Sequence, residues 1–226
     1  MVGPPETFVI IAAFNEGRVI RGVAAEVAAR GYPVVVVDDG STDDTVARAR
    51  GPGVFVLRHA INLGQGAALQ TGIDYALRRG ARALVTFDAD GQHSADDIPA
   101  LVDALASHDI ALGSRFLGKP MVGASRRRTL MLHAATAVSN RMSGMALSDA
   151  HCGLRAFRAT AAPALRLEQD RMAHASELLR KIRRGGLRVV EVPVTIRYTE
   201  HSQRKGQSGF QAVRILFDYF FRASSR

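Results

Sequence analysis

The sequence has very little cysteine and no recognisable export signal. Its 226 residues include one cysteine, Cys152, so an internal disulfide bond is excluded. The first residues, MVGPPETF, lack both the basic start and the apolar block of a secretory signal. Because structural disulfides belong to oxidising compartments, the single cysteine favours a reducing compartment, and we expect the protein in the cytoplasm.

Long apolar runs are also missing. A membrane-spanning helix needs roughly 18 or more consecutive, predominantly apolar residues. The nearest candidate, residues 129–147, contains His133, Asn140 and Arg141. We therefore expect a protein that is soluble or bound peripherally to a membrane face, with residues 129–147 as one candidate for lipid contact.

Acidic residues are outnumbered, 21 Asp and Glu against 30 Lys and Arg, which gives a formal charge of +9. The excess is concentrated in residues 126–128, 180–188 and 204–205. Such patches are either solvated helix faces or sites for anions such as nucleotides, lipid phosphates or a membrane surface. They lack interleaved aromatic residues and no nucleic-acid-binding motif is present, so nucleic acid is not an expected partner.

Short apolar runs alternate with helical patterns in the first half of the chain. The runs are rich in Val and Ile and cover residues 7–13, 33–39, 53–58, 83–88 and 109–114. Continuous runs of this length are typical of strands buried on both faces. With a helix predicted over residues 65–79, the pattern indicates an α/β fold with a mostly parallel sheet flanked by helices.

After residue 115 the pattern changes. A basic, glycine-broken segment (115–128) precedes a long helix, a second helix near residues 172–184 and a last strand over residues 187–196. The tail from Phe210 to Arg222 is an amphipathic helical extension that either packs on the domain or lies in a membrane interface. Without repeats or low-complexity linkers, we expect one domain over residues 1–226, although two small lobes are an alternative.

Polar residues follow several of the predicted strands. Ligands bind at the carboxyl ends of strands in an open parallel sheet. These ends carry Asn15 and Glu16, then Asp38 and Asp39, then the segment DADGQH (88–93), and finally Arg115. Ser41 or Thr42 is expected to cap the following helix, and helix capping is the alternative explanation for the whole DDGST segment.

The spacing of Asp88, Asp90 and Gln92 suggests a metal site. Residues two apart in an extended segment point to the same side, so the three side chains can present oxygen atoms to one point. Mg²⁺ and Mn²⁺ prefer oxygen ligands and leave positions for substrate phosphates. Gly91 permits the tight turn, and a diphosphate would complete the coordination.

Phosphate groups would need cations as well. The candidates are Arg115, the cluster at residues 126–128, and the segment Arg204–Ser208, whose neighbouring glycines suggest a loop that closes over a ligand.

Several segments together resemble one known family. They are AAFNE (12–16), VVDDGSTDDT (36–45), NLGQGAALQTGIDYA (62–76), FDADGQH (87–93), GSR (113–115), DAHCGLRAF (149–157), GLRVVEVPV (186–194) and RKGQS (204–208). In this order they resemble family-2 glycosyltransferases of the GT-A fold, close to the branch of dolichyl-phosphate mannose synthase and the polyprenyl-phosphate glycosyltransferases. The sequence departs from the common pattern at Ala12, where proline is frequent, and at Cys152, where serine is frequent.

The resemblance implies roles for matching positions. The residues implied to bind the nucleotide are Ala12, Phe14, Glu16, Asp38, Asp39, Asp88 and Ala89. Those implied to bind phosphate are Arg115, one of Arg127 and Arg128, Arg204 and Ser208. The implied metal ligands are Asp88, Asp90 and Gln92, and the implied catalytic residues are Asp90, Arg115 and Arg128. Residues 1–115 would then form the nucleotide-sugar half and residues 116–226 the acceptor half.

The implied reaction is an inverting, Mg²⁺- or Mn²⁺-dependent transfer of a sugar from GDP-mannose or a UDP-sugar to dolichyl or undecaprenyl phosphate at a membrane face, with a membrane protein as a further potential partner. One alternative is transfer to a glycan hydroxyl, which requires a carboxylate base, and Asp149 and Glu177 are candidates. Glu177 is alternatively a charged residue on a helix surface, and His93 and His151 are expected to be structural.

Another alternative is a non-catalytic nucleotide-sugar-binding or scaffold protein. A nucleotidyltransferase is disfavoured, because the glycine-rich, lysine-bearing loop typical of such enzymes is missing after Ile10.

Overall fold

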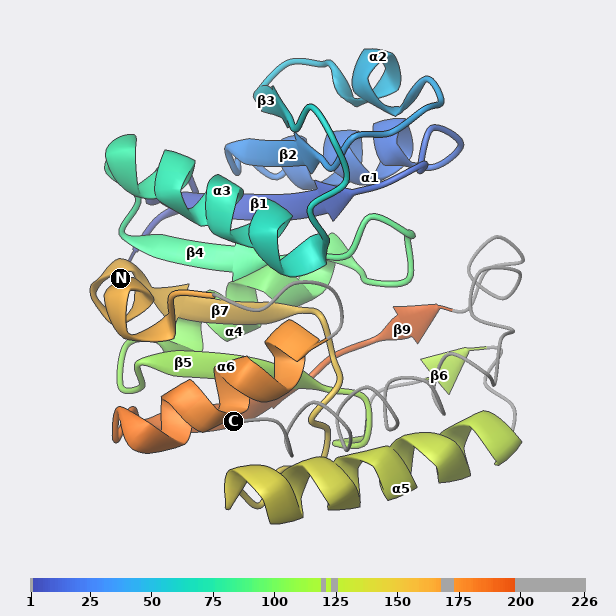
Figure 1. Ribbon diagram of the computed structural model, residues 1–226. Coiled ribbons are helices and arrows are strands. Elements are labelled where there is room, and N and C mark those ends of the chain that lie inside the picture. The colour runs from blue at the N-terminus through green and yellow to red at the C-terminus, as the bar shows by residue number, and fades with distance from the viewer. Residues whose placement is uncertain (1, 119–120, 123–125, 168–172, 198–226) are drawn as a thin grey trace.

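The computed structural model describes residues 2–118, 121–122, 126–167 and 173–197 (Figure 1). The strands are β1 (Thr7–Ala13), β2 (Val34–Asp38), β3 (Val54–Arg58), β4 (Ala83–Thr86), β5 (Ile110–Ser114), β6 (Met121–Val122), β7 (Arg155–Arg158), β8 (Val189–Pro193) and β9 (Ile196–Arg197). The α-helices are α1 (Ile20–Ala28), α2 (Thr45–Ala49), α3 (Gln65–Arg78), α4 (Ile98–Ala104), α5 (Arg126–Ser143) and α6 (Ala173–Arg184).

Seven strands form one sheet in the order β3-β2-β1-β4-β7-β5-β8. β7 is antiparallel to both of its neighbours, and every other neighbouring pair is parallel. The predicted mostly parallel sheet is therefore confirmed. All five strands predicted before residue 115 are present, although β3, at the edge of the sheet, is only partly buried.

The later strands differ from the prediction. The run at residues 187–196 is divided into β8, in the main sheet, and β9, which pairs with β6 in a separate two-stranded sheet. β7, with the sequence RAFR, was not predicted. It has only two apolar residues between two arginines, too short a pattern to indicate a strand.

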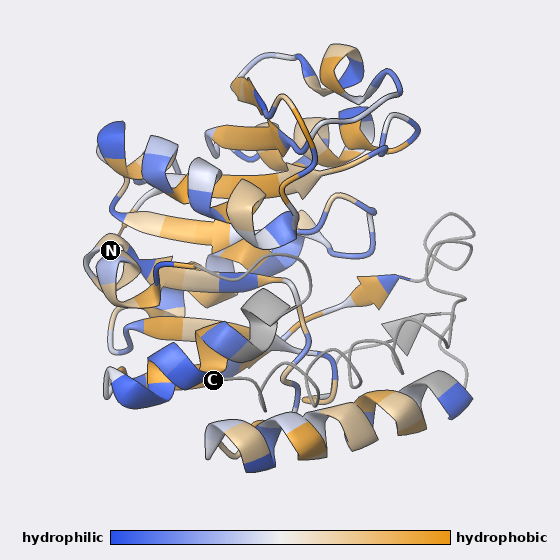
Figure 2. Cartoon of the chain, viewed as in Figure 1, coloured by the Kyte–Doolittle hydropathy of each residue, from blue (hydrophilic) through white to orange (hydrophobic). Residues whose placement is uncertain are grey.

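The core forms two layers, one on each face of the sheet. Ile11 and Val36 lie in the layer under α1 and α4, whereas Ile10 and Val35 lie in the layer under α3 and α6. Figure 2 shows the hydrophobic strands at the centre of the molecule and polar segments on the outside of α3 and α6. Gly72 of α3 permits the closest packing, because a Cβ atom there would lie 2.4 Å from Cγ2 of Ile10.

Strand order reverses beside β1. The chain passes from β1 to β2 and β3 on one side, and β4 then lies on the other side of β1. Crevices at the carboxyl ends of strands form at such switch points in open α/β sheets.

α5 runs along the lower edge of the molecule in Figure 1. Leu130, Met131 and Met142 of this helix are exposed, by 72%, 49% and 40% respectively. No helix in the described residues combines the length and the apolar character needed to cross a bilayer. The predicted C-terminal helix (210–222) and the segment Arg204–Ser208 lie outside the described residues.

Candidate active site

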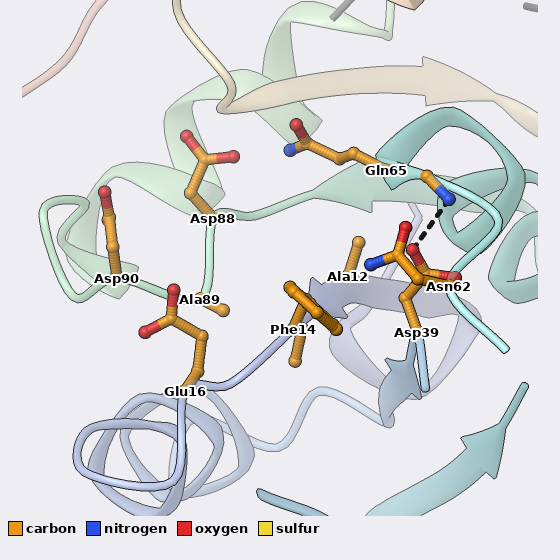
Figure 3. A pocket seen from close by; sticks show the side chains of 11 residues that line it. Ala12, Phe14, Glu16, Asp39, Asn62, Gln65, Asp88, Ala89 and Asp90 are labelled. Carbon is orange, nitrogen blue, oxygen red and sulfur yellow. Dashed lines mark hydrogen bonds between the residues drawn. The ribbon is translucent and has the colours of Figure 1, made fainter. Parts of the chain in front are cut away.

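A cavity of about 450 Å³ opens at the carboxyl ends of β1, β2 and β4 (Figure 3). Its walls are formed by Ala12, Ala13, Phe14, Glu16, Asp39, Asn62, Gly64, Gln65, Asp88, Ala89 and Asp90. The cavity thus lies at the switch point of the sheet. It brings together six of the seven residues that the resemblance assigned to the nucleotide.

The loop after β1 is held by the loop after β2. The Asn15 N–H group donates to Oγ of Ser41 over 2.8 Å, and Asn15 Oδ1 accepts from the Thr42 N–H group over 2.9 Å. Asn15 adopts a left-handed conformation (φ 53°), which asparagine tolerates better than most residues. The capping prediction for Ser41 and Thr42 is therefore wrong. Their polar groups bind Asn15, and α2 begins after Asp44 without a side-chain cap.

Asp38 and Asp39 occupy different environments. Asp39 lines the cavity, while Asp38 does not and is fully buried. Asp38 Oδ2 accepts from the Ser41 N–H group over 3.2 Å and lies 3.6 Å from Nε of Arg58. Consecutive residues at a strand end point to opposite sides, so the sheet directs only one of the two carboxylates towards the cavity.

Asp88 is fixed by two neighbours. Nε2 of the buried His93 lies 2.9 Å from its Oδ2 atom. The backbone of Gly153 packs against the carboxylate so closely that a Cβ atom there would lie 2.1 Å from Oδ2. His93 is thus a hydrogen-bonded buried histidine, as expected, and its partner is a carboxylate of the cavity wall.

Asp90 and Gln92 bind each other. The Gln92 N–H group donates to Oδ1 of Asp90 over 3.0 Å, and Nε2 of Gln92 donates to Oδ2 over 2.5 Å. Burial, followed by the charge of Asp88, raises the pKa of Asp90. Gln92 is not part of the cavity wall, and its amide nitrogen is turned to Asp90, so a metal site of Asp88, Asp90 and Gln92 stays a prediction. Gly91, with φ 74°, turns the chain between them and ends the two-residue alternation.

The residues of the cavity wall include two carboxylates that suit a divalent cation. Within the described part of the chain, no group of three or more His, Cys, Asp and Glu side chains is arranged to hold a metal ion. Asp88 and Asp90 nevertheless line the same cavity, where burial and then the charge of Asp88 raise the pKa of Asp90. Two carboxylates suit a cation that takes its other ligands from substrate oxygens and water.

Arg115 follows β5 and is not part of the cavity wall. Its Nε atom donates to Oδ2 of Asp149 over 2.5 Å, and Nη2 donates to Oδ1 over 2.7 Å. Burial alone would raise the pKa of Asp149, but the hydrogen bonds and charge of Arg115 outweigh it and the pKa is lowered. The carboxylate of Glu191 accepts hydrogen bonds from the N–H groups of Ser148 and Asp149, which holds this segment in place.

The remaining residues predicted to bind phosphate are Arg127, Arg128, Arg204 and Ser208. Arg127 is exposed at the start of α5. The side chain of Arg128, and Arg204 and Ser208 as a whole, lie outside the described residues.

Glu177 is buried and pairs with Lys181 over 2.9 Å, so its assignment to a helix surface is wrong. His151 is hydrogen-bonded as expected, with Nε2 3.1 Å from Oγ of Ser139, and burial lowers its pKa.

Several site residues, among them Asn62, Gln65 and Gly153, had no predicted role. Asn62 and Gln65 line the cavity from the loop before α3 and from its first residue, and Gly153 supports Asp88. All three lie within segments that carried the family resemblance, namely NLGQG and HCGLR. Their position in those segments was the available signal.

The fold is that of an α/β enzyme, with a cavity at the strand switch point that is lined by Asp88 and Asp90. The family model described as "Glycosyl transferase family 2" matches residues 8–165. The chain belongs to this family and is a glycosyltransferase, as the sequence predicted.

Two relatives and one solved structure are similar over most of the chain. A UDP-N-acetylglucosamine–dolichyl-phosphate N-acetylglucosaminyltransferase from Methanococcus voltae is 31% identical, covering 95% of this chain and 93% of the relative. An undecaprenyl-phosphate mannosyltransferase from Micrococcus luteus is 34% identical, covering 81% of this chain and 79% of the relative. The structure of glucosyl-3-phosphoglycerate synthase from Mycobacterium tuberculosis has a TM-score of 0.66 at 20% identity, covering 94% of this chain and 78% of that one. The latter supports the GT-A fold alone.

Proposed function

We propose that this glycosyltransferase transfers a sugar from a nucleoside-diphosphate sugar to a polyprenyl phosphate. Two similar relatives are named for transfer to dolichyl phosphate and undecaprenyl phosphate. The observation that carries the proposal is the acidic pair Asp88 and Asp90, which lines a cavity at the switch point of the sheet. A donor diphosphate placed there would need a cation between its oxygens and these carboxylates.

On the donor side, the nucleotide would contact Ala12, Phe14, Glu16 and Asp39, which line one side of the cavity (Figure 3). Asp88 and Asp90 would hold Mg²⁺ or Mn²⁺. When bound, the ion would neutralise charge on the leaving diphosphate. Gln92 and His93 would orient the two carboxylates through the hydrogen bonds that they already make.

On the acceptor side, a phosphate oxygen is already anionic near neutral pH and needs no strong general base. Attack from the face opposite the leaving diphosphate would invert the anomeric centre. A hydroxyl acceptor would need a basic carboxylate. Asp149 is bound by Arg115, with a lowered pKa, and Glu177 is paired with Lys181. Both contacts argue against a base and therefore favour a phosphate acceptor.

A lipid acceptor requires a membrane surface nearby. We propose that α5 supplies this contact from the cytoplasmic side. Leu130, Met131 and Met142 are exposed on this helix, and Arg126 and Arg127 are exposed at its start. Apolar side chains flanked by basic ones suit the interface of an anionic membrane. A membrane-protein partner at the same surface is a second proposal that the apolar exposure supports.

The decisive experiment is a transfer assay with radiolabelled nucleotide sugars, offered both polyprenyl phosphate and soluble saccharides. We expect label in the lipid phase and inversion at the anomeric carbon. Label found only in saccharide would reject the lipid-phosphate acceptor. The absence of transfer from every GDP- and UDP-sugar, in the presence of Mn²⁺, would favour the non-catalytic alternative.

A further inference from the structure

Three hydrogen bonds hold the carboxylate of Asp39 in place. Its Oδ1 atom accepts from the Leu63 N–H group over 2.9 Å and lies 2.8 Å from Nδ1 of His59. Its Oδ2 atom accepts from the Gly64 N–H group over 2.7 Å. An ionised carboxylate has about four acceptor positions. Within the part of the chain that the structure describes, one of them, on Oδ2, is left over.

His59 is fixed in one tautomer by its two partners. Its Nε2 atom lies 3.0 Å from Oγ1 of Thr71, which belongs to α3. Because an ionised carboxylate only accepts, Nδ1 of His59 carries a proton, and in the neutral ring Nε2 accepts from the Thr71 hydroxyl group. The hydrogen bonds therefore run in one direction, from Thr71 through His59 to Asp39.

The backbone around Asp39 also holds its carboxylate in place. Gly64 has φ 99°, a conformation that side-chain-bearing residues rarely adopt, and its N–H group points at Oδ2. The side chain of His59 is 11% exposed and that of Asp39 is 4% exposed, so water competes little for these bonds. The carboxylate cannot rotate without breaking three hydrogen bonds.

We propose that His59 and Thr71 are positioning residues for the donor nucleotide, which orient Asp39 so that its remaining acceptor position on Oδ2 receives a hydrogen-bond donor of the nucleotide. The inference rests on the proposed function, which places the nucleotide beside Asp39. The donor group is either the ring N–H of uracil or guanine or a ribose hydroxyl. Cytosine and adenine lack that ring N–H, so the two sources are distinguishable.

The experiment measures the affinity of the 226-residue protein for UDP, GDP, CDP and ADP by calorimetry with Mg²⁺ present. His59→Leu removes the donor to Asp39, whereas His59→Asn keeps an N–H group near the position of Nδ1. Thr71→Val removes only the hydroxyl group. The matched control is His108→Asn, since His108 precedes β5, four strands away from β2 in the sheet, and contacts Ser107 and Ala104.

We expect His59→Leu to weaken binding of the preferred nucleotide about tenfold, with recovery to within about threefold in His59→Asn and an intermediate loss in Thr71→Val. A loss confined to UDP and GDP identifies the ring N–H, and an equal loss for all four nucleotides identifies the ribose. Both outcomes support the proposal.

Unchanged affinity in His59→Leu, in a protein whose circular dichroism spectrum and melting temperature match the wild type, overturns the positioning role. If His59→Leu does not fold, an unchanged affinity in Thr71→Val together with a loss in His59→Asn does the same. Failure of the wild-type protein to bind any nucleoside diphosphate refutes the proposed function itself, and the positioning role with it.

Discussion

Asp88 and Asp90 line the same cavity but are supported in different ways. Asp88 rests on His93 and Gly153, while Asp90 is bound by the amide groups of Gln92. The pKa of Asp90 is raised by burial and by the charge of Asp88. Ionised Asp90 therefore opposes folding in the metal-free protein, which gives the site a stability cost that a bound cation would relieve.

Replacing Asp90 by Asn separates stability from catalysis. The pKa of Asp90 in the folded state lies above the ordinary value of 3.8. The protein therefore loses stability as the pH rises from 3.8 to the folded-state pKa, and this loss remains at pH 7. We expect Asp90→Asn to raise the free energy of unfolding of the metal-free protein at pH 7. Turnover should fall on the order of 1,000-fold. Urea denaturation and initial rates test the two effects, with the exposed Asp96→Asn as control. Retained turnover would remove Asp90 from the mechanism.

Gly153→Ala tests the support of Asp88. The new Cβ atom would lie 2.1 Å from Oδ2 of Asp88, so the carboxylate must move. We expect at least a roughly tenfold loss of kcat/KM, because small displacements of a positioned group are costly. The control is Gly22→Ala in α1, where a Cβ atom meets nothing within 4 Å. That control should keep its activity and gain about 0.5–1 kcal/mol of stability. Equal kinetics in the two variants would contradict the proposed support.

Residue types and spacing predicted much of the cavity wall but not its hydrogen bonding. Glu16, Asp39, Asp88 and Asp90 follow predicted strands, and the switch point brings them together. Asp38 illustrates what was missed, because neighbouring residues at a strand end face opposite ways and the sequence does not say which one faces the ligand.

Among the secondary-structure elements, the strands were more predictable than the short segments between them. A parallel strand buried on both faces needs an unbroken apolar run, and each such run before residue 115 is a strand. β7 has two apolar residues, and α2 has five residues in all, so neither has enough sequence to show a period. Their conformation depends on the tertiary neighbours that surround them.

The ion pair between Arg115, after β5, and Asp149, before β7, stabilises the fold. Arg115 and Asp149 are both buried, and removing one partner of a buried ion pair costs about 3–5 kcal/mol. We expect Arg115→Met to lower the free energy of unfolding by that amount. Arg115→Met combined with Asp149→Leu should cost less than the sum of the single changes. Additive losses in urea denaturation would show that the pair is not coupled.

The same pair predicts an acid dependence. The pKa of Asp149 in the folded state is below its ordinary value of 3.8, so its contribution to stability is present above that value and is lost as pH falls through the folded-state pKa. Asp149→Asn should flatten the fall in unfolding free energy below about pH 4. A slope as steep as that of the wild type would assign acid unfolding to other carboxylates.

For the whole molecule, α5 is the surface that would meet a membrane. We expect Leu130→Glu together with Met131→Glu to weaken binding to vesicles containing anionic lipid by about tenfold or more, because both apolar side chains are exposed and would enter the interface. Vesicle sedimentation measures the effect. Ile61→Glu, 67% exposed on the loop before α3, is the matched control. Equal binding by both variants would place the membrane contact elsewhere.

The position of β7 has a consequence for how the chain is made. This strand comes from the second half of the sequence yet lies between β4 and β5, which belong to the first half. The neighbours of β5 in the sheet are β7 and β8, which both come later in the sequence. During synthesis, β5 therefore cannot pair with the rest of the sheet until β7 has left the ribosome. Such non-local pairing slows folding. Genetic truncation or fusion at residue 115 should accordingly yield aggregation-prone product rather than a working half-enzyme.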